Sequence, residues 1–143
     1  MNRLRKYFAQ MAKAMLVPVN PSAVLILGVL TFVWGFWVAN PWWEVFSHAQ
    51  VYSVLDNLPE WCVGLLAMTT GAVTCWGAIR GKPPAVYIGA AVAGWYWLMI
   101  SVCYFVGDWH NTGGIVSLFL SIYCGFIYLN IHVNDRYYRK NNQ

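Results

Sequence analysis

The sequence contains very few charged residues. Asp, Glu, Lys and Arg together make up 10% of the 143 residues, whereas hydrophobic residues make up 59%. In an ordinary soluble domain about a quarter of the residues are charged. A folded chain of this composition has too few polar side chains to cover its own surface. The composition therefore excludes an ordinary soluble domain and indicates a protein surrounded largely by lipid.

Several motifs that carry chemistry in membrane proteins are also missing. The four cysteines, Cys62, Cys75, Cys103 and Cys124, form no C-x-x-C pair, so neither a zinc ribbon nor a thiol oxidoreductase motif is present. Ion and proton transporters normally carry ionisable residues in mid-membrane, and no long apolar stretch has one at its centre. The charged helix residues of glutathione-using membrane enzymes are absent as well. We therefore expect no enzymatic activity and no cofactor.

Long apolar runs are what the sequence has in abundance. A helix needs roughly 20 mostly apolar residues to cross a bilayer. Four stretches meet this requirement, at about residues 22–39, 60–79, 85–106 and 113–131. Asn57 and Glu60 predict a capping box at the start of the second stretch, because they stand three residues apart just before it. The predicted fold is all-α: a single transmembrane domain, residues 1–143, forming an integral membrane four-helix bundle.

The distribution of basic residues predicts the orientation. With four spans, all nine Lys and Arg residues fall on one side of the membrane: Arg3, Arg5, Lys6, Lys13, Arg80, Lys82, Arg136, Arg139 and Lys140. The loops on the other side contain acidic residues and no Lys or Arg. Because basic residues concentrate on the cytoplasmic side, both termini are predicted to be cytoplasmic, with the protein in a bacterial inner membrane. This topology also accounts for the net charge of +4, so we expect no specific binding to nucleic acid.

Two segments outside the spans have the pattern of interfacial helices. Residues 1–17 place apolar side chains at helical spacing among basic ones, and residues 42–52 on the outer side show a similar spacing. A plain basic tail is the alternative for the first segment, and residues 132–143 are predicted to be a basic cytoplasmic tail. The residues expected at the membrane interface are Phe8, Met11, Trp42, Trp43, Trp61 and Trp109.

Small residues recur along the predicted spans. Inside a bilayer, helices associate through close approach at Gly, Ala and Ser, because hydrophobicity alone does not drive them together. The residues expected to make these contacts are Gly64, Gly71, Gly89, Ala93, Gly113, Ser117, Ser121 and Gly125. Packing within one chain is the simplest interpretation, and a face left over for oligomerisation is the alternative.

The outer loops contain the one group of potential metal ligands. Glu44 and His48 are four residues apart, and Asp108 and His110 lie in the second outer loop. If the loops met, these side chains could bind zinc or copper. Hydrogen bonds to loop backbone and water explain them more simply, so no metal site is assigned. A disulfide between Cys62 and Cys103 is conceivable, and free buried thiols are the favoured interpretation.

A few short motifs resemble those of a group of small polytopic membrane proteins encoded by tailed bacteriophages. The motifs are Leu58-Pro59-Glu60-Trp61 followed by Gly64 and Gly71, then Trp95, Thr112-Gly113 and Tyr123. The resemblance covers about residues 21–133. It implies a setting, phage infection of a bacterium, and carries over no catalytic residues.

The leading hypothesis is a non-enzymatic phage membrane protein. It would act in the host inner membrane by associating with itself or with other phage proteins, and a holin-like pore former is one concrete version. One alternative is a virion component delivered with the genome during ejection. Another is a superinfection-exclusion factor that blocks a second phage.

Overall fold

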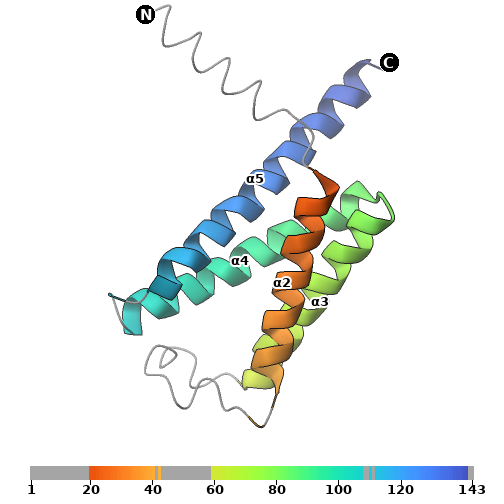
Figure 1. The fold of residues 1–143 in the computed structure, drawn as a ribbon. Coiled ribbons are helices and arrows are strands. Elements are labelled where there is room, and N and C mark those ends of the chain that lie inside the picture. Colours follow the sequence, from red (N-terminus) through yellow and green to blue (C-terminus); the bar gives the residue numbers. More distant parts are fainter. Residues whose placement is uncertain (1–19, 41, 43–58, 108–109, 111, 142–143) are drawn as a thin grey trace, which may run out of the picture.

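The computed structural model describes residues 20–40, 42, 59–107, 110 and 112–141, and side chains only up to His132 in the last helix. These residues form the helices α2 (Pro21–Ala39), α3 (Glu60–Ile79), α4 (Pro83–Gly107) and α5 (Thr112–Asn141), shown in Figure 1. No strand occurs in this described part of the chain.

All four helices are long and apolar enough to cross a membrane. The apolar stretches are 19, 20, 25 and 21 residues long, and the last of them covers Thr112–His132. At 1.5 Å per residue, a helix of 20 residues extends about 30 Å, which matches the hydrocarbon thickness of a bilayer. The prediction of an all-helical chain with four spans is thus confirmed.

The first span begins where local sequence rules place it. Asn20 is the N-cap of α2, and its side-chain oxygen accepts a hydrogen bond of 3.0 Å from the backbone N–H of Ser22. Pro21 follows at the first helical position, where its missing N–H leaves no donor unpaired. Asn40 ends the helix in an extended conformation.

The predicted capping box of α3 is wrong. The N-cap is Pro59, not Asn57, and Pro59 makes no side-chain capping bond; Glu60 is therefore the first helical residue instead of the third. The physical reason is the proline, because the residue before a proline is disfavoured in the α conformation. Leu58 precedes Pro59, so the helix starts after the proline, and the Pro59 carbonyl accepts the first N–H groups of the helix, from Cys62 and Val63.

The connection from α3 to α4 is a tight turn. Gly81 has a φ of 58°, the left-handed conformation that glycine adopts without strain. The N–H of Lys82 donates to the carbonyl of Gly77 at 2.9 Å, and the N–H of Gly81 donates to that of Ala78 at 3.4 Å, which is the Schellman pattern. Pro83 then begins α4 at once.

The helices form two antiparallel hairpins that diverge from each other. α2 packs along α3, α4 packs along α5, and a smaller contact between α3 and α4 joins the hairpins. Figure 1 shows the start of α2 and the end of α5 on the same side of the molecule, as expected for an even number of spans. The last helix continues beyond His132, so the predicted basic tail is helical as far as Asn141.

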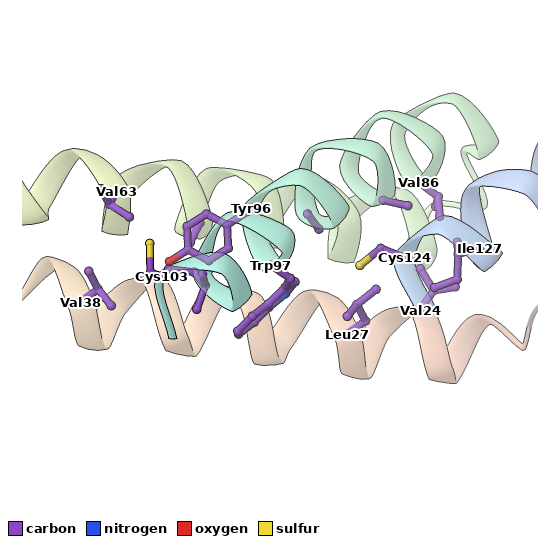
Figure 2. Packing of buried hydrophobic residues seen from close by; sticks show 14 residues of the cluster. Val24, Leu27, Val38, Val63, Val86, Tyr96, Trp97, Cys103, Cys124 and Ile127 are labelled. Atoms are coloured by element: carbon purple, nitrogen blue, oxygen red, sulfur yellow. The ribbon is translucent and has the colours of Figure 1, made fainter. Parts of the chain in front are cut away.

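The buried core lies where the hairpins cross. Figure 2 shows Val24 and Leu27 of α2 gathered with Cys124 and Ile127 of α5 at one end of this core. Toward the other end, the Trp97 ring of α4 lies against α2. Away from the crossing, large apolar side chains remain exposed on every helix, which suits a protein surrounded by lipid.

Candidate functional site

Four glycines hold α2 and α3 in close contact. Gly28 lies opposite Gly71, and Gly35 lies opposite Gly64. A methyl group at Gly35 would lie 2.6 Å from the carbonyl oxygen of Gly64, and one at Gly71 would lie 2.6 Å from that of Gly28. Because backbone atoms are the obstruction, no rearrangement of side chains could relieve such a clash. The α2–α3 hairpin is therefore a contact between backbones.

The hairpin α4–α5 is joined by small residues and hydroxyl groups. The Ser121 hydroxyl donates to the carbonyl of Gly94 at 2.9 Å, and the Ser101 hydroxyl donates to that of Gly114, also at 2.9 Å. Each bond crosses from one helix to the other. In a bilayer, such bonds stabilise helix pairs because no water competes for the groups.

The eight predicted packing residues occupy different environments. Gly64 and Gly71 face α2, Gly89 contacts Thr74 of α3, and Ala93 is 1% exposed. Along α5, Ser117 is 4% exposed, whereas a methyl group at Gly125 would meet no heavy atom within 4 Å. Gly113 and Ser117 line the groove described below. The small residues of α5 therefore do not all lie on one helix–helix contact.

Sequence reasoning overlooked Gly28. Gly28 and Gly35 are seven residues apart, as are Gly64 and Gly71, and this matched spacing is visible in the sequence. Two antiparallel helices with equal spacing bring the glycines into register as two facing pairs.

An aromatic cluster connects α4 to α2 near the middle of both helices. The indole N–H of Trp97 donates to the Thr31 hydroxyl at 3.1 Å, and that hydroxyl donates to the Leu27 carbonyl at 2.9 Å. The Trp34 ring lies 5.8 Å from the Trp97 ring, and Tyr96 meets Trp97 edge-on at 5.6 Å. The bond to Thr31 removes the cost of burying the Trp97 N–H in an apolar region.

An apolar groove opens between α2 and α5, where the hairpins diverge. It has a volume of about 870 Å³. One wall is α2 from Leu25 to Trp37, the floor is Trp97 and Tyr104 of α4, and the other wall is α5 from Thr112 to Leu120. α2 and α5 make no extended contact over their described lengths, so no described helix closes the groove.

A second aromatic group lies at the end of the molecule that carries the α3–α4 turn. The Tyr87 ring of α4 stacks on the Tyr128 ring of α5 with centroids 4.2 Å apart, and the two hydroxyls are hydrogen-bonded. His132 stacks on the same pair, 6.4 Å from Tyr128. This stack fixes the register of α5 against α4 close to the end of the span.

The predicted metal candidates lie mainly outside the described residues, which include neither Glu44, His48 nor Asp108. His110 lies in an exposed turn. Among the residues that are described, no group of three or more His, Cys, Asp or Glu could hold a metal ion. The four cysteines, Cys62 and Cys103 included, are free thiols.

Two of the predicted interfacial tryptophans are described. Trp42 is 87% exposed and follows α2, and Trp61 is 61% exposed near the start of α3. Both therefore lie at the same end of the α2–α3 hairpin. Phe8, Met11, Trp43 and Trp109 lie outside the described residues. So do the predicted interfacial segment 1–17 and, apart from Trp42, the predicted segment 42–52.

The fold and its surfaces define a multi-pass, all-helical protein with four helices able to span a membrane. Comparison with known protein families, with curated proteins and with solved structures finds no match to this chain.

Proposed function

We propose that this protein acts without catalysis, by associating with a second copy of itself in the plane of the membrane. The observation that carries the proposal is the groove between α2 and α5. In a tightly packed bundle these two helices would contact each other, whereas here both present side chains to the bilayer.

The chemistry of the two walls supports a helix as the occupant. The α2 wall presents bulky apolar side chains, with Ile26 67% and Val33 56% exposed. The α5 wall contains Gly113, which is partly exposed, and a glycine allows another helix to approach closely at that point. A second copy supplies such an apolar helix at the same membrane depth.

Oxidative cross-linking of single cysteines tests this proposal. The four native cysteines are first replaced by Ala, and then Val116 or Ile122 of α5 is replaced by Cys. These two residues are a matched pair, because they are 58% and 59% exposed and only Val116 lines the groove. In membranes, the V116C chain should form disulfide-linked dimers and the I122C chain should not. Equal cross-linking at both positions, or none at Val116, would contradict association through the groove.

We further propose that the setting is phage infection of a bacterium, with the protein in the host inner membrane. The resemblance of Leu58-Pro59-Glu60-Trp61 and the motifs after it supports this setting. A gene neighbourhood beside endolysin genes would favour the holin-like version, and one among virion genes would favour the virion component. Resistance of expressing cells to a second phage would favour exclusion.

A metal-dependent activity in the outer loops is the competing proposal. Replacing both His48 and His110 by Gln should leave membrane insertion and the biological effect nearly intact. Loss of the effect in this double variant, together with zinc or copper in the purified wild-type protein, would make the outer loops the active site.

Substitutions in the predicted amphipathic segment at the start of the chain should, in contrast, reduce the biological effect. Replacing both Phe8 and Met11 by Glu removes apolar contact and adds negative charge, so it should weaken binding to the cytoplasmic interface and reduce the biological effect. An unchanged effect would argue that this segment is a plain basic tail.

A further inference from the structure

The fold brings two separate groups of basic residues to one end of the molecule. Arg80 and Lys82 are exposed in the α3–α4 turn, whose backbone is held by the bonds to Gly77 and Ala78. The second group is Arg136, Arg139 and Lys140, in the last two turns of α5. Figure 1 shows this end of α5 on the same side of the molecule as the α3–α4 turn. We call these five residues the basic end.

The aromatic stack of Tyr87, Tyr128 and His132 connects the two groups. Tyr87 follows Lys82 by five residues, and His132 precedes Arg136 by four residues, about one helical turn. Since Tyr87 and Tyr128 are in direct contact, α4 and α5 are held together next to both groups of charges. The basic end is thus a product of tertiary packing as well as of sequence.

Basic residues outnumber acidic residues in the segments that meet at this end. Arg80 and Lys82 make no ion pair with any residue that the structure describes. Asp135 is the single acidic residue near the basic end in sequence, and Glu60 begins α3 at the far end of that helix. Five basic residues against one acidic residue leave a net positive end, which fits an anionic partner.

The depth of these residues identifies the partner. The described apolar span of α5 reaches His132, and the first charged residue after it is Asp135. Arg136 to Lys140 then lie roughly 6–12 Å further along the helix axis. The headgroup layer on each side of the hydrocarbon is about 5–8 Å thick, so the backbone of Arg136 falls within that layer and that of Arg139 and Lys140 falls a few ångströms beyond it. Arg80 and Lys82 border the apolar ends of α3 and α4, at the same layer.

We propose that the basic end binds the headgroups of anionic phospholipids. Clusters of four to eight Lys and Arg directly beside a transmembrane helix are typical of such binding, and each residue contributes about 1 kcal/mol, or roughly a fivefold change in affinity. The anionic phosphate lies at the depth of Arg80, Lys82 and Arg136, and the hydrogen-bonded turn presents two of these charges with little loss of backbone entropy on binding.

The test compares the binding of two lipids to purified protein in a neutral detergent. In detergent the orientation of the protein in a membrane does not affect the measured affinity. Thermal stability and native mass spectrometry would measure binding of phosphatidylglycerol and of phosphatidylcholine. The wild-type chain should prefer phosphatidylglycerol at least tenfold, and the preference should fall as salt is raised. The R80Q/K82Q variant should lose roughly 25-fold in affinity for phosphatidylglycerol, and the R136Q/R139Q/K140Q variant should lose more.

The matched control is Glu60→Gln, which changes one charge at the opposite end and should leave the preference unchanged. A variant whose unfolding temperature without lipid equals that of the wild type reports on lipid binding alone. The two groups of basic residues are changed in separate variants, so that the proposal can still be tested if one variant misfolds. Equal binding of both lipids, or wild-type preference in both basic variants, would overturn the proposal. Stabilisation by inorganic phosphate equal to that by phosphatidylglycerol, or tighter binding of a single-stranded oligonucleotide, would also overturn it.

Discussion

Replacing Gly35 by Ala should separate α2 from α3. A methyl group at this position would lie 2.6 Å from both the Gly64 carbonyl oxygen and the Met68 backbone nitrogen. Ordinary contacts of this kind begin at about 3.4 Å, so the two helices must move apart locally by about 0.8 Å. Both obstructing atoms belong to the backbone, and the shift therefore has to be made by a whole helix segment.

The cost follows from the contacts that such a shift loosens. A gap of 0.5–1 Å forfeits about a quarter to a half of the dispersion energy of each affected atom pair. Overpacking in closely packed interiors costs about 1–3 kcal/mol. For a chain of this length, about 2 kcal/mol corresponds to a fall in the unfolding temperature of about 6 °C. Gly64→Ala should have a similar effect, since a methyl group there would lie 2.5 Å from the Ala39 nitrogen.

The double variant G35A/G64A sharpens the test. Once the helices have moved apart for the first methyl group, the second methyl group meets less obstruction. The destabilisation of the double variant should therefore be smaller than the sum of the destabilisations of the two single variants. The measurement is thermal unfolding in detergent, followed by tryptophan fluorescence. Gly125→Ala is the control, because its methyl group would meet no heavy atom within 4 Å and should not destabilise the protein. An unfolding temperature of Gly35→Ala equal to that of the wild type would refute the backbone contact between α2 and α3.

Three further predictions concern other parts of the structure. Ser121→Leu should lower the unfolding temperature in detergent, because it removes the hydrogen bond to the Gly94 carbonyl. An unchanged unfolding temperature would mean that this face of α5 faces lipid. Trp97→Phe and Thr31→Val should each destabilise, and a double-mutant cycle should give a coupling of about 0.6–1.7 kcal/mol; zero coupling would argue against the bond between them. For the orientation, a Cys introduced at Trp109 should react with an impermeant reagent added to intact cells, and one at Lys82 should react only after the cells are broken.

Much of the fold followed from local patterns. The hydrophobic stretches predicted the start of each of the four helices to within two residues. Bilayer thickness sets the length of a span, and nearby Pro, Gly and Asn residues set where each helix begins and ends. The cap of α3 was the exception. There the effect of Pro59 on the preceding residue outweighed the more familiar pattern of a capping box.

The surfaces proposed for function were less predictable. Every span offered small residues, so the sequence did not say which faces would meet; Gly28 was overlooked, and Gly125 proved to have open space beside it. The groove also depends on the angle at which the hairpins cross, which follows from many simultaneous contacts around Trp97 and Thr31.

The sequence by itself determined that this chain is helical, how many times it can cross a membrane and where its charges lie along the chain, since each of these depends on residues close together in sequence. Only the tertiary structure decided that Gly28 faces Gly71, that α2 and α5 diverge around a groove, and that Tyr87 stacks on Tyr128. Those features join residues far apart in the chain. Composition does not distinguish between the possible pairs of helix faces, and the steric fit between whole helices selects among them.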